Sequence, residues 1–158
     1  MLNLTQRQTE FLRRLLRGPG LTSEIRTFLE VAVASKLNPE LALRILIGML
    51  VAAIEEPNGE VATITSAYRD PARQRALIAK WDAGDRAGLV VRPSETSWHL
   101  QGRAIDISTN YANFAQLRDI LENLGLEWGG RWKRPDPVHF QWTYGGTRRS
   151  IKQLLAAG

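Results

Sequence analysis

The sequence predicts an α+β protein with a small, mainly antiparallel sheet flanked by helices. Two observations lead to this prediction. Helical periodicity dominates up to about residue 56, and from residue 61 short segments with strand-like alternation appear between further helical ones. The resulting order, helices first and then strand, helix, strand, helix and two short strands, is typical of an α+β architecture.

Three helices are expected before the turn at Pro57. The first, from about residue 5, opens with a capping-box pattern and ends at the Gly-Pro-Gly of residues 18–20. A second is expected over residues 22–35. The third begins with Asn38 as its cap and a proline in its first turn. Residues 1–37 are therefore predicted to form an N-terminal helical extension to a single compact domain of residues 38–158.

The first predicted strand is residues 61–66, which are rich in β-branched side chains. Asp70 and the proline after it are expected to cap a helix. Residues 82–98 contain two glycines, a proline and several polar residues, and are predicted to form a long loop. Loops of this length in compact domains are often functional.

Strand alternation orients the two strands that carry the chemistry. In residues 103–108, Asp106 points away from the face shared by two isoleucines. In residues 138–142, His139 and Gln141 share the face opposite to that of the three apolar residues. Each strand thus presents an apolar set to the core and polar residues on its other face.

The remaining elements are shorter. A helix from about residue 111 to 124 and a short strand over 126–128 are predicted between these two strands, and a glycine stops the helix. Thr147 is expected to cap a final helix that ends the chain.

Composition limits the possible sites and partners. The chain has no cysteine, so disulfides and thiolate metal sites are excluded and a metal must be held by His, Asp, Glu or backbone oxygen. The formal net charge of +5 draws a protein to polyanions, although a solvated basic surface explains it equally well. Nucleic-acid binding is not expected, because no base-stacking or groove-reading motif is present.

The ends and apolar segments of the chain predict its location. No segment has the pattern of a signal peptide, so the chain is expected to be made in the cytoplasm. The most apolar stretch, residues 41–54, contains Arg44 and is shorter than the ~20 residues of a membrane span. The basic helix near the N-terminus is a candidate contact for anionic wall polymers or an outer-membrane surface, and a helix packed on the domain shows the same pattern.

Both histidines lie in two short stretches near aspartates. His99, Asp106 and His139 make a three-ligand set of the kind that catalytic zinc uses, with a fourth position for water. Asp136, three residues before His139, is then free to act as a base. Taken singly, each histidine is more often structural than a ligand, and Asp106 can be an ordinary strand-end carboxylate.

Three stretches also carry a family pattern: SAYRDPARQ at 66–74, SWHLQGRAID at 97–106 and GLEWGGRWKRPDPVHFQW at 125–142. They resemble the D-alanyl-D-alanine carboxypeptidase and L-alanyl-D-glutamate endopeptidase family of zinc peptidases, which includes VanY-type carboxypeptidases and many phage endolysins. The resemblance covers about residues 38–142. It implies a hedgehog or D-Ala-D-Ala peptidase-like fold.

The resemblance also implies a role for individual residues. It implies zinc held by His99, Asp106 and His139, with Asp136 as general base. It assigns oxyanion stabilisation to Arg69, a place near the substrate to Tyr68, Gln74 and Ser97, and a turn to Gly102. From the residues alone, a salt bridge to Asp70 or Glu95 explains Arg69 as well, and Trp128 and Trp132 suit the cleft or the core.

The resemblance implies an L-alanyl-D-glutamate endopeptidase of phage endolysin type that acts as a monomer on the peptidoglycan stem peptide. Such an enzyme reaches the cell wall after holin-mediated release and needs no signal peptide. A D-alanyl-D-alanine carboxypeptidase is the alternative within the enzyme class. A non-catalytic zinc-containing virion or wall-binding module is the alternative outside it.

Overall fold

The computed structural model describes residues 36–55 and 62–157. The helices expected before residue 36, and with them the basic helix and most of the proposed extension, lie outside the described residues. The described part is α+β, as predicted. Its helices are α3 (Pro39–Glu55), α4 (Pro71–Asp82), α5 (Phe114–Asn123), α6 (Ile151–Ala156) and the short 3-10 helices η1 (Trp98–Gln101) and η2 (Gly129–Arg131).

The strands form one antiparallel sheet in the order β1-β2-β4-β3. They are β1 (Ile64–Ser66), β2 (Ala104–Ile107), β3 (Glu127–Trp128) and β4 (His139–Gln141). In the central pair, Asp106 lies opposite His139 and Ile105 lies opposite Phe140. This register places the polar residues of both strands on one face and the apolar residues on the other, which confirms the predicted alternation.

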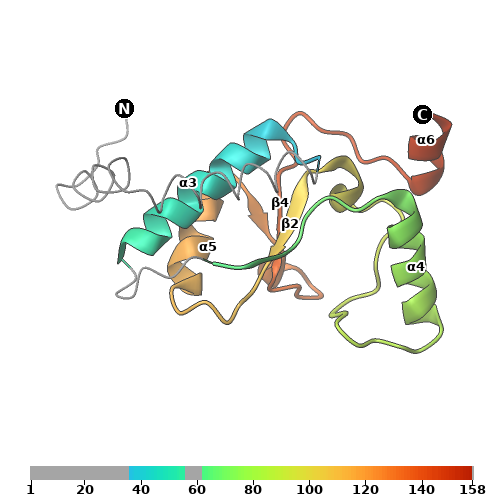
Figure 1. Cartoon of the computed structure of the whole chain (residues 1–158), viewed down its shortest axis with the longest axis horizontal. Helices are drawn as coiled ribbons and strands as arrows, with labels where there is room; N and C mark the ends of the chain where they lie inside the picture. The colour runs from blue at the N-terminus through green and yellow to red at the C-terminus, as the bar shows by residue number, and fades with distance from the viewer. Residues whose placement is uncertain (1–35, 56–61, 158) are drawn as a thin grey trace, which may run out of the picture.

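The apolar face of the sheet packs against α3 and α5, which lie side by side (Figure 1). Asn38 caps α3 as predicted, because its Oδ1 accepts hydrogen bonds from the backbone N–H groups of Glu40 and Leu41. The two helices approach closely at Gly48, where an added Cβ would lie 2.5 Å from Leu121 Cδ2. The core contains fully buried Leu41, Ile45, Ile105, Ile107, Leu117, Leu121 and Phe140.

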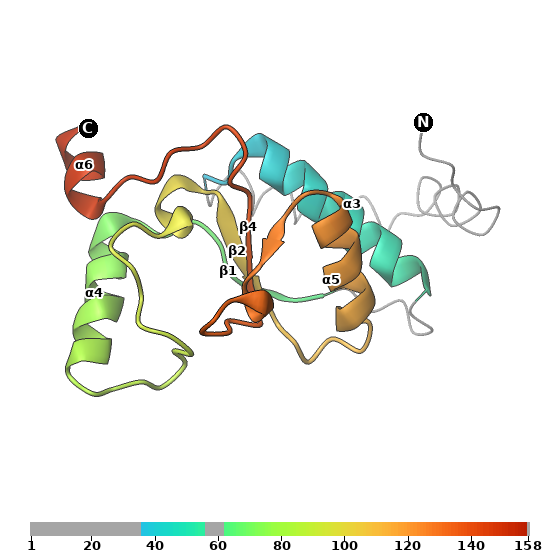
Figure 2. The same cartoon turned by 180° about the vertical axis from the view of Figure 1, so that it is seen from behind.

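The long loop predicted at residues 82–98 spans residues 83–97 in the structure, where it contains no helix or strand and runs from α4 back to η1 (Figure 2). Asp70 caps α4 as predicted, since its Oδ1 accepts a hydrogen bond from Arg73 N. The loop is tied to α6 where Ile151 N donates to Glu95 O. No helix in the described part of the chain is long and apolar enough to cross a membrane.

The start of α6 differs from the prediction. Ser150, and not Thr147, caps this helix. Its hydroxyl accepts from Gln153 N, while the Gln153 side chain accepts from Ser150 N, so the two residues complete a capping box. Thr147 has no such partner three residues later, which explains why the helix begins after Ser150.

Candidate metal centre

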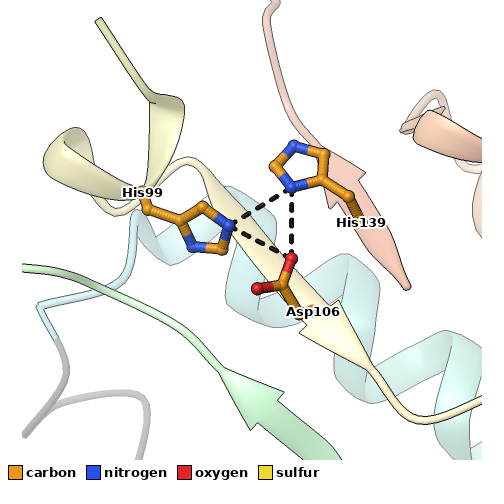
Figure 3. A group of neighbouring side chains, drawn as sticks. All are labelled: His99, Asp106 and His139. Atoms are coloured by element: carbon orange, nitrogen blue, oxygen red, sulfur yellow. Dashed lines mark hydrogen bonds and ion pairs between the residues drawn. The ribbon is translucent and has the colours of Figure 1, made fainter. Parts of the chain in front are cut away.

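Two strands and a 3-10 helix bring His99, Asp106 and His139 together (Figure 3). Asp106 Oδ1 lies 3.2 Å from His99 Nε2 and 3.1 Å from His139 Nδ1, and the two nitrogens are 3.2 Å apart. All three side chains are buried. The sheet register supplies the Asp106 and His139 pair, and η1 delivers His99 to the same point.

A tight turn holds His99 in place. Ser97 caps η1, with its Oγ accepting from His99 N at 3.3 Å. The helix ends at Gly102, whose φ of 64° is left-handed. An added Cβ at Gly102 would lie 2.1 Å from Lys36 O, so this position also requires the absence of a side chain. The glycine that the sequence motif singled out therefore connects the helix of His99 to the strand of Asp106.

The orientation of the His99 ring shows which of its nitrogens is free. His99 Nδ1 lies 2.7 Å from Ala67 O. A carbonyl oxygen only accepts, so Nδ1 carries the hydrogen, and in a neutral imidazole Nε2 then has a lone pair. That lone pair faces the Asp106 carboxylate. Two groups that both accept hydrogen bonds thus point at each other across a buried space, which is stable only with a proton or a cation between them.

The cluster fits a zinc ion by its donor atoms and their spacing. Two imidazoles and one carboxylate are the donor set of catalytic zinc sites that keep one position open. In a tetrahedral zinc site with bonds of ~2.0–2.2 Å, neighbouring ligand atoms are about 3.3–3.6 Å apart. The separations of 3.1–3.2 Å are close to this range. These three residues are thus suited to hold the metal.

The second oxygen of Asp106 is bound by Arg69. Arg69 Nη2 lies 2.6 Å from Asp106 Oδ2, and Arg69 Nε donates to Ser66 Oγ at 3.0 Å. Burial alone would raise the pKa of Asp106, but hydrogen bonds from a protonated His139 or His99 outweigh it and hold this pKa well below its ordinary value. The ion pair of Arg69 is therefore with a buried residue of the cluster, and not with the surface carboxylates considered from the sequence.

Asp136 lies beside the cluster with one oxygen free. Its backbone bridges η2 and β4, because Asp136 N donates to Gly129 O and His139 N donates to Asp136 O. Within the described residues, its buried Oδ1 has no hydrogen-bond partner. Burial raises the pKa of this carboxyl group. A partly buried carboxylate with an unused acceptor is suited to act as a general base, and this role of Asp136 stays a prediction.

The cluster opens into a cavity of about 460 Å³. Its wall includes part of the long loop together with Ser97, Trp98, Asp136 and Arg148. The loop predicted to be functional from its length and composition therefore lines the same cavity as His99, Asp106 and His139.

The residues predicted to bind substrate take different places. Ser97 lines the cavity and caps η1. Gln74 lines the cavity but is fully buried, and its Nε2 donates to Ser94 O at 2.7 Å, so it also holds the loop. Tyr68 is not among the described residues that line this cavity, and its ring lies 5.6 Å from Lys36 Nζ. Its predicted substrate contact stays a prediction.

The tryptophans divide between cleft and core. The ring centroid of Trp132 lies 5.1 Å from that of His139, and Trp132 lines the cavity. Trp128 packs against Phe114 at the edge of the core, and its Nε1 donates to Pro137 O at 2.7 Å. Of the two positions considered for these tryptophans from the sequence, Trp132 therefore lies in the cleft and Trp128 packs at the core.

Three further cavity residues were not predicted from the sequence: Glu127, Gln141 and Arg148. The alternation of β4 did place Gln141 on the face of His139, which was a usable signal. Glu127 depends on the register between β3 and β4, and the sequence carries no direct sign of it. Arg148 lies on the segment after the sheet, where no periodic pattern exists.

Comparison with known proteins agrees with the sequence motifs. Residues 91–142 match the family model described as D-alanyl-D-alanine carboxypeptidase. The chain is also similar to the crystal structure of Serratia marcescens L-Ala D-Glu endopeptidase ChiX, with 26% sequence identity, a TM-score of 0.47, and coverage of 68% of this chain and 81% of that chain. No curated protein matches the chain. The family segment contains His99, Asp106, Asp136 and His139, so the resemblance to this peptidase family is confirmed.

Proposed function

We propose that this chain, whose residues 91–142 match the D-alanyl-D-alanine carboxypeptidase family, is a zinc metallopeptidase that hydrolyses the stem peptide of peptidoglycan. One observation carries the proposal. The buried acceptor atoms of His99, Asp106 and His139 converge at 3.1–3.2 Å, beside a cavity whose wall also includes Asp136, and within the described residues the buried Oδ1 of Asp136 has no hydrogen-bond partner. A metal site and a base in one cavity are the two parts that hydrolysis of a peptide bond needs.

Zinc bound at such a site supplies Lewis acidity and lowers the pKa of bound water to ~7. The chain's own residues would do the rest. Asp136 Oδ1 takes the proton of the attacking water as the new bond to the peptide carbonyl carbon forms. When the C–N bond breaks, Asp136 returns this proton to the leaving amine, so the carboxylate ends the cycle in its starting state.

Arg69 is proposed to place positive charge beside the carbonyl oxygen of the substrate. Its Nη2 is occupied by Asp106 at 2.6 Å, while its Nη1 has only a long contact of 3.4 Å with Gln74 Oε1. Nη1 of this cavity-lining arginine therefore keeps donor capacity. A fixed donor of this kind stabilises the negative charge that develops on the oxygen in the transition state.

The sequence resemblance favours an L-alanyl-D-glutamate endopeptidase of phage endolysin type, acting on the cell wall after holin-mediated release. A D-alanyl-D-alanine carboxypeptidase is the second candidate, because the matched family carries that description. Arg148 in the cavity wall suits both, since each substrate has a carboxylate close to the bond that is cut.

Digestion of purified peptidoglycan, with mass spectrometry of the new ends, tests the proposal. New amino-terminal D-glutamate is expected for the endopeptidase. Release of free D-alanine alone would contradict the endopeptidase and support the carboxypeptidase. Protein that binds one zinc ion per chain and cuts neither bond would favour the non-catalytic module.

A further inference from the structure

A chain of hydrogen bonds leads from the metal cluster to the edge strand of the sheet. Gln141 Oε1 lies 3.1 Å from His139 Nε2, and Gln141 Nε2 donates to Glu127 Oε2 at 2.6 Å. The other oxygen of the same carboxylate accepts from Thr143 Oγ1 at 2.9 Å. Gln141 is only 3% exposed, whereas Glu127 is exposed. A buried amide thus connects a surface carboxylate to a candidate metal ligand.

The sheet itself builds this chain. His139 and Gln141 are two residues apart on β4, so their side chains share a face. Glu127 is the cross-strand partner of Gln141 on β3, and Ala104 is its partner on β2. Side chains at directly opposed positions are in contact range. Ala104 offers only a methyl group, so its side chain does not compete with His139 or Glu127 for the amide of Gln141.

Glu127 decides which way the amide of Gln141 points. A glutamine amide has an accepting oxygen and a donating nitrogen at its two ends, and either end can face an imidazole. An ionised carboxylate only accepts, so it selects the amide nitrogen of Gln141. The oxygen is then left for His139 Nε2, which must carry the hydrogen. In neutral His139 the lone pair is therefore on Nδ1, the atom that faces Asp106 and His99.

We propose that Glu127 and Gln141 are positioning residues that fix the tautomer of His139 so that Nδ1 is free to bind the metal. The two histidines then reach the same result by different means. The backbone carbonyl of Ala67 fixes His99 with Nε2 free, and a pair of side chains fixes His139 with Nδ1 free. This role rests on the proposed function only in requiring that the cluster hold a metal ion.

Nitrogen NMR of the imidazole rings tests the tautomer directly in metal-free protein. The chain has two histidines, so the spectrum of ¹⁵N-histidine-labelled protein contains only two rings. At a pH well above the ordinary imidazole pKa, His139 is expected to carry its hydrogen on Nε2 in the wild type and in Glu127→Gln. In Gln141→Leu and Glu127→Ala, His139 is expected to become a mixture of tautomers, while the ring of His99 stays unchanged.

Zinc affinity, measured by competition with a chromophoric chelator, gives the second readout. Loss of a residue that orients a metal-binding histidine typically weakens metal binding ~10–100-fold, and this loss is expected for Gln141→Leu. Glu127→Ala is expected to lose less, and Glu127→Gln to keep wild-type affinity because its amide oxygen can still accept from Gln141. The matched control is Asp119→Ala, which removes an exposed carboxylate on α5.

The outcomes separate this proposal from the proposed function. If the wild type binds zinc and Gln141→Leu binds it equally well with an unchanged His139 ring, the positioning role is wrong. If the wild type binds no zinc, the proposed function fails, and the tautomer spectra of the metal-free variants still decide whether Glu127 and Gln141 orient His139. Thermal unfolding of each metal-free variant separates a lost hydrogen bond from a lost fold.

Discussion

The two faces of the sheet bury residues of opposite character. On one face, Ile105, Ile107 and Phe140 are fully buried against α3 and α5. On the other, Asp106, His139 and Gln141 are 8%, 7% and 3% exposed. Burial on the first face stabilises the fold, because it removes apolar surface from water. Burial on the second is unfavourable unless every polar atom has a partner.

The difference shows how a functional site can be recognised within a buried region. The apolar face needs no bound ion or water, since its side chains pack against one another and have no hydrogen-bonding atoms to satisfy. The polar face is incomplete, because lone pairs of His99, Asp106 and His139 converge and Asp136 keeps a buried oxygen without a hydrogen-bond partner in the described structure. A cation and a water molecule would satisfy these atoms. The predictions below test this contrast between the two faces.

The largest effect is expected on the polar face. Asp136→Ala should lower peptidoglycan cleavage ~10²–10⁴-fold, because it removes the general base, and should keep zinc. His139→Ala should lose both zinc and cleavage. Metal analysis after dialysis and the clearing of wall suspensions measure the two properties. The control is Asp119→Ala, an exposed carboxylate on α5. Cleavage by Asp136→Ala at the rate of this control would exclude the proposed base.

A substitution on the apolar face is expected to lower the stability of the fold and not to act on the chemistry of the site directly. Phe140→Ala is expected to lower the free energy of unfolding by ~3–5 kcal/mol, because it removes a fully buried ring and leaves a cavity. Urea unfolding of metal-free protein measures this loss. Tyr144→Ala is the control, since its ring is 79% exposed, and a change within about 0.5 kcal/mol is expected. Equal losses for the two variants would mean that the apolar face is not the core.

The turn between η1 and β2 should show an intermediate effect. Gly102→Ala combines a left-handed φ with a contact of 2.1 Å between the new Cβ and Lys36 O. Gly84→Ala has a similar φ of 85° but no atom within 4 Å of the new Cβ, so it should cost only the ~1–2 kcal/mol of the left-handed conformation. Gly102→Ala should cost more than this in urea unfolding, and should also weaken zinc binding because His99 moves. Equal losses of unfolding free energy for Gly102→Ala and Gly84→Ala would contradict the expected clash between the new Cβ and Lys36 O.

Local features of the fold were well predicted from the sequence, because short-range patterns determine them. The caps at Asn38 and Asp70 and the alternation around Asp106 and His139 all depend on neighbours within a few residues. Boundaries were less accurate. The helix expected from residue 111 begins at Phe114, because Tyr111 belongs to the turn before it and is buried in the core.

The candidate site was only partly predictable, for a physical reason. The identity of the three converging residues followed from strand faces and from motif spacing, and the structure brings them together. The pairing of Arg69 with Asp106, and of Glu127 with Gln141, depends on which strands are neighbours and in what register. Register is decided by the whole sheet, so no local pattern in a single sequence contains it.

The smallest expected effect concerns two carboxylates of one cavity whose pKa values shift in opposite directions. Burial raises the pKa of Asp136, so its ionised form destabilises the metal-free fold once the pH exceeds the ordinary aspartate value. Asp136→Asn should therefore unfold like the wild type at low pH and become the more stable protein as the pH rises through the raised pKa of Asp136.

Asp106 should behave in the opposite way. Burial would raise its pKa, but a hydrogen bond from a protonated His139 or His99 lowers it overall, so its ionised form contributes stability above the ordinary aspartate pKa for as long as one of these histidines holds the shared proton. Asp106→Asn should therefore lose stability at neutral pH, and the loss should shrink as the pH falls toward the lowered pKa. Urea unfolding of metal-free protein across acidic to neutral pH measures both variants. Parallel pH profiles for the two variants would contradict the assignment, because one carboxylate must stabilise the fold where the other destabilises it.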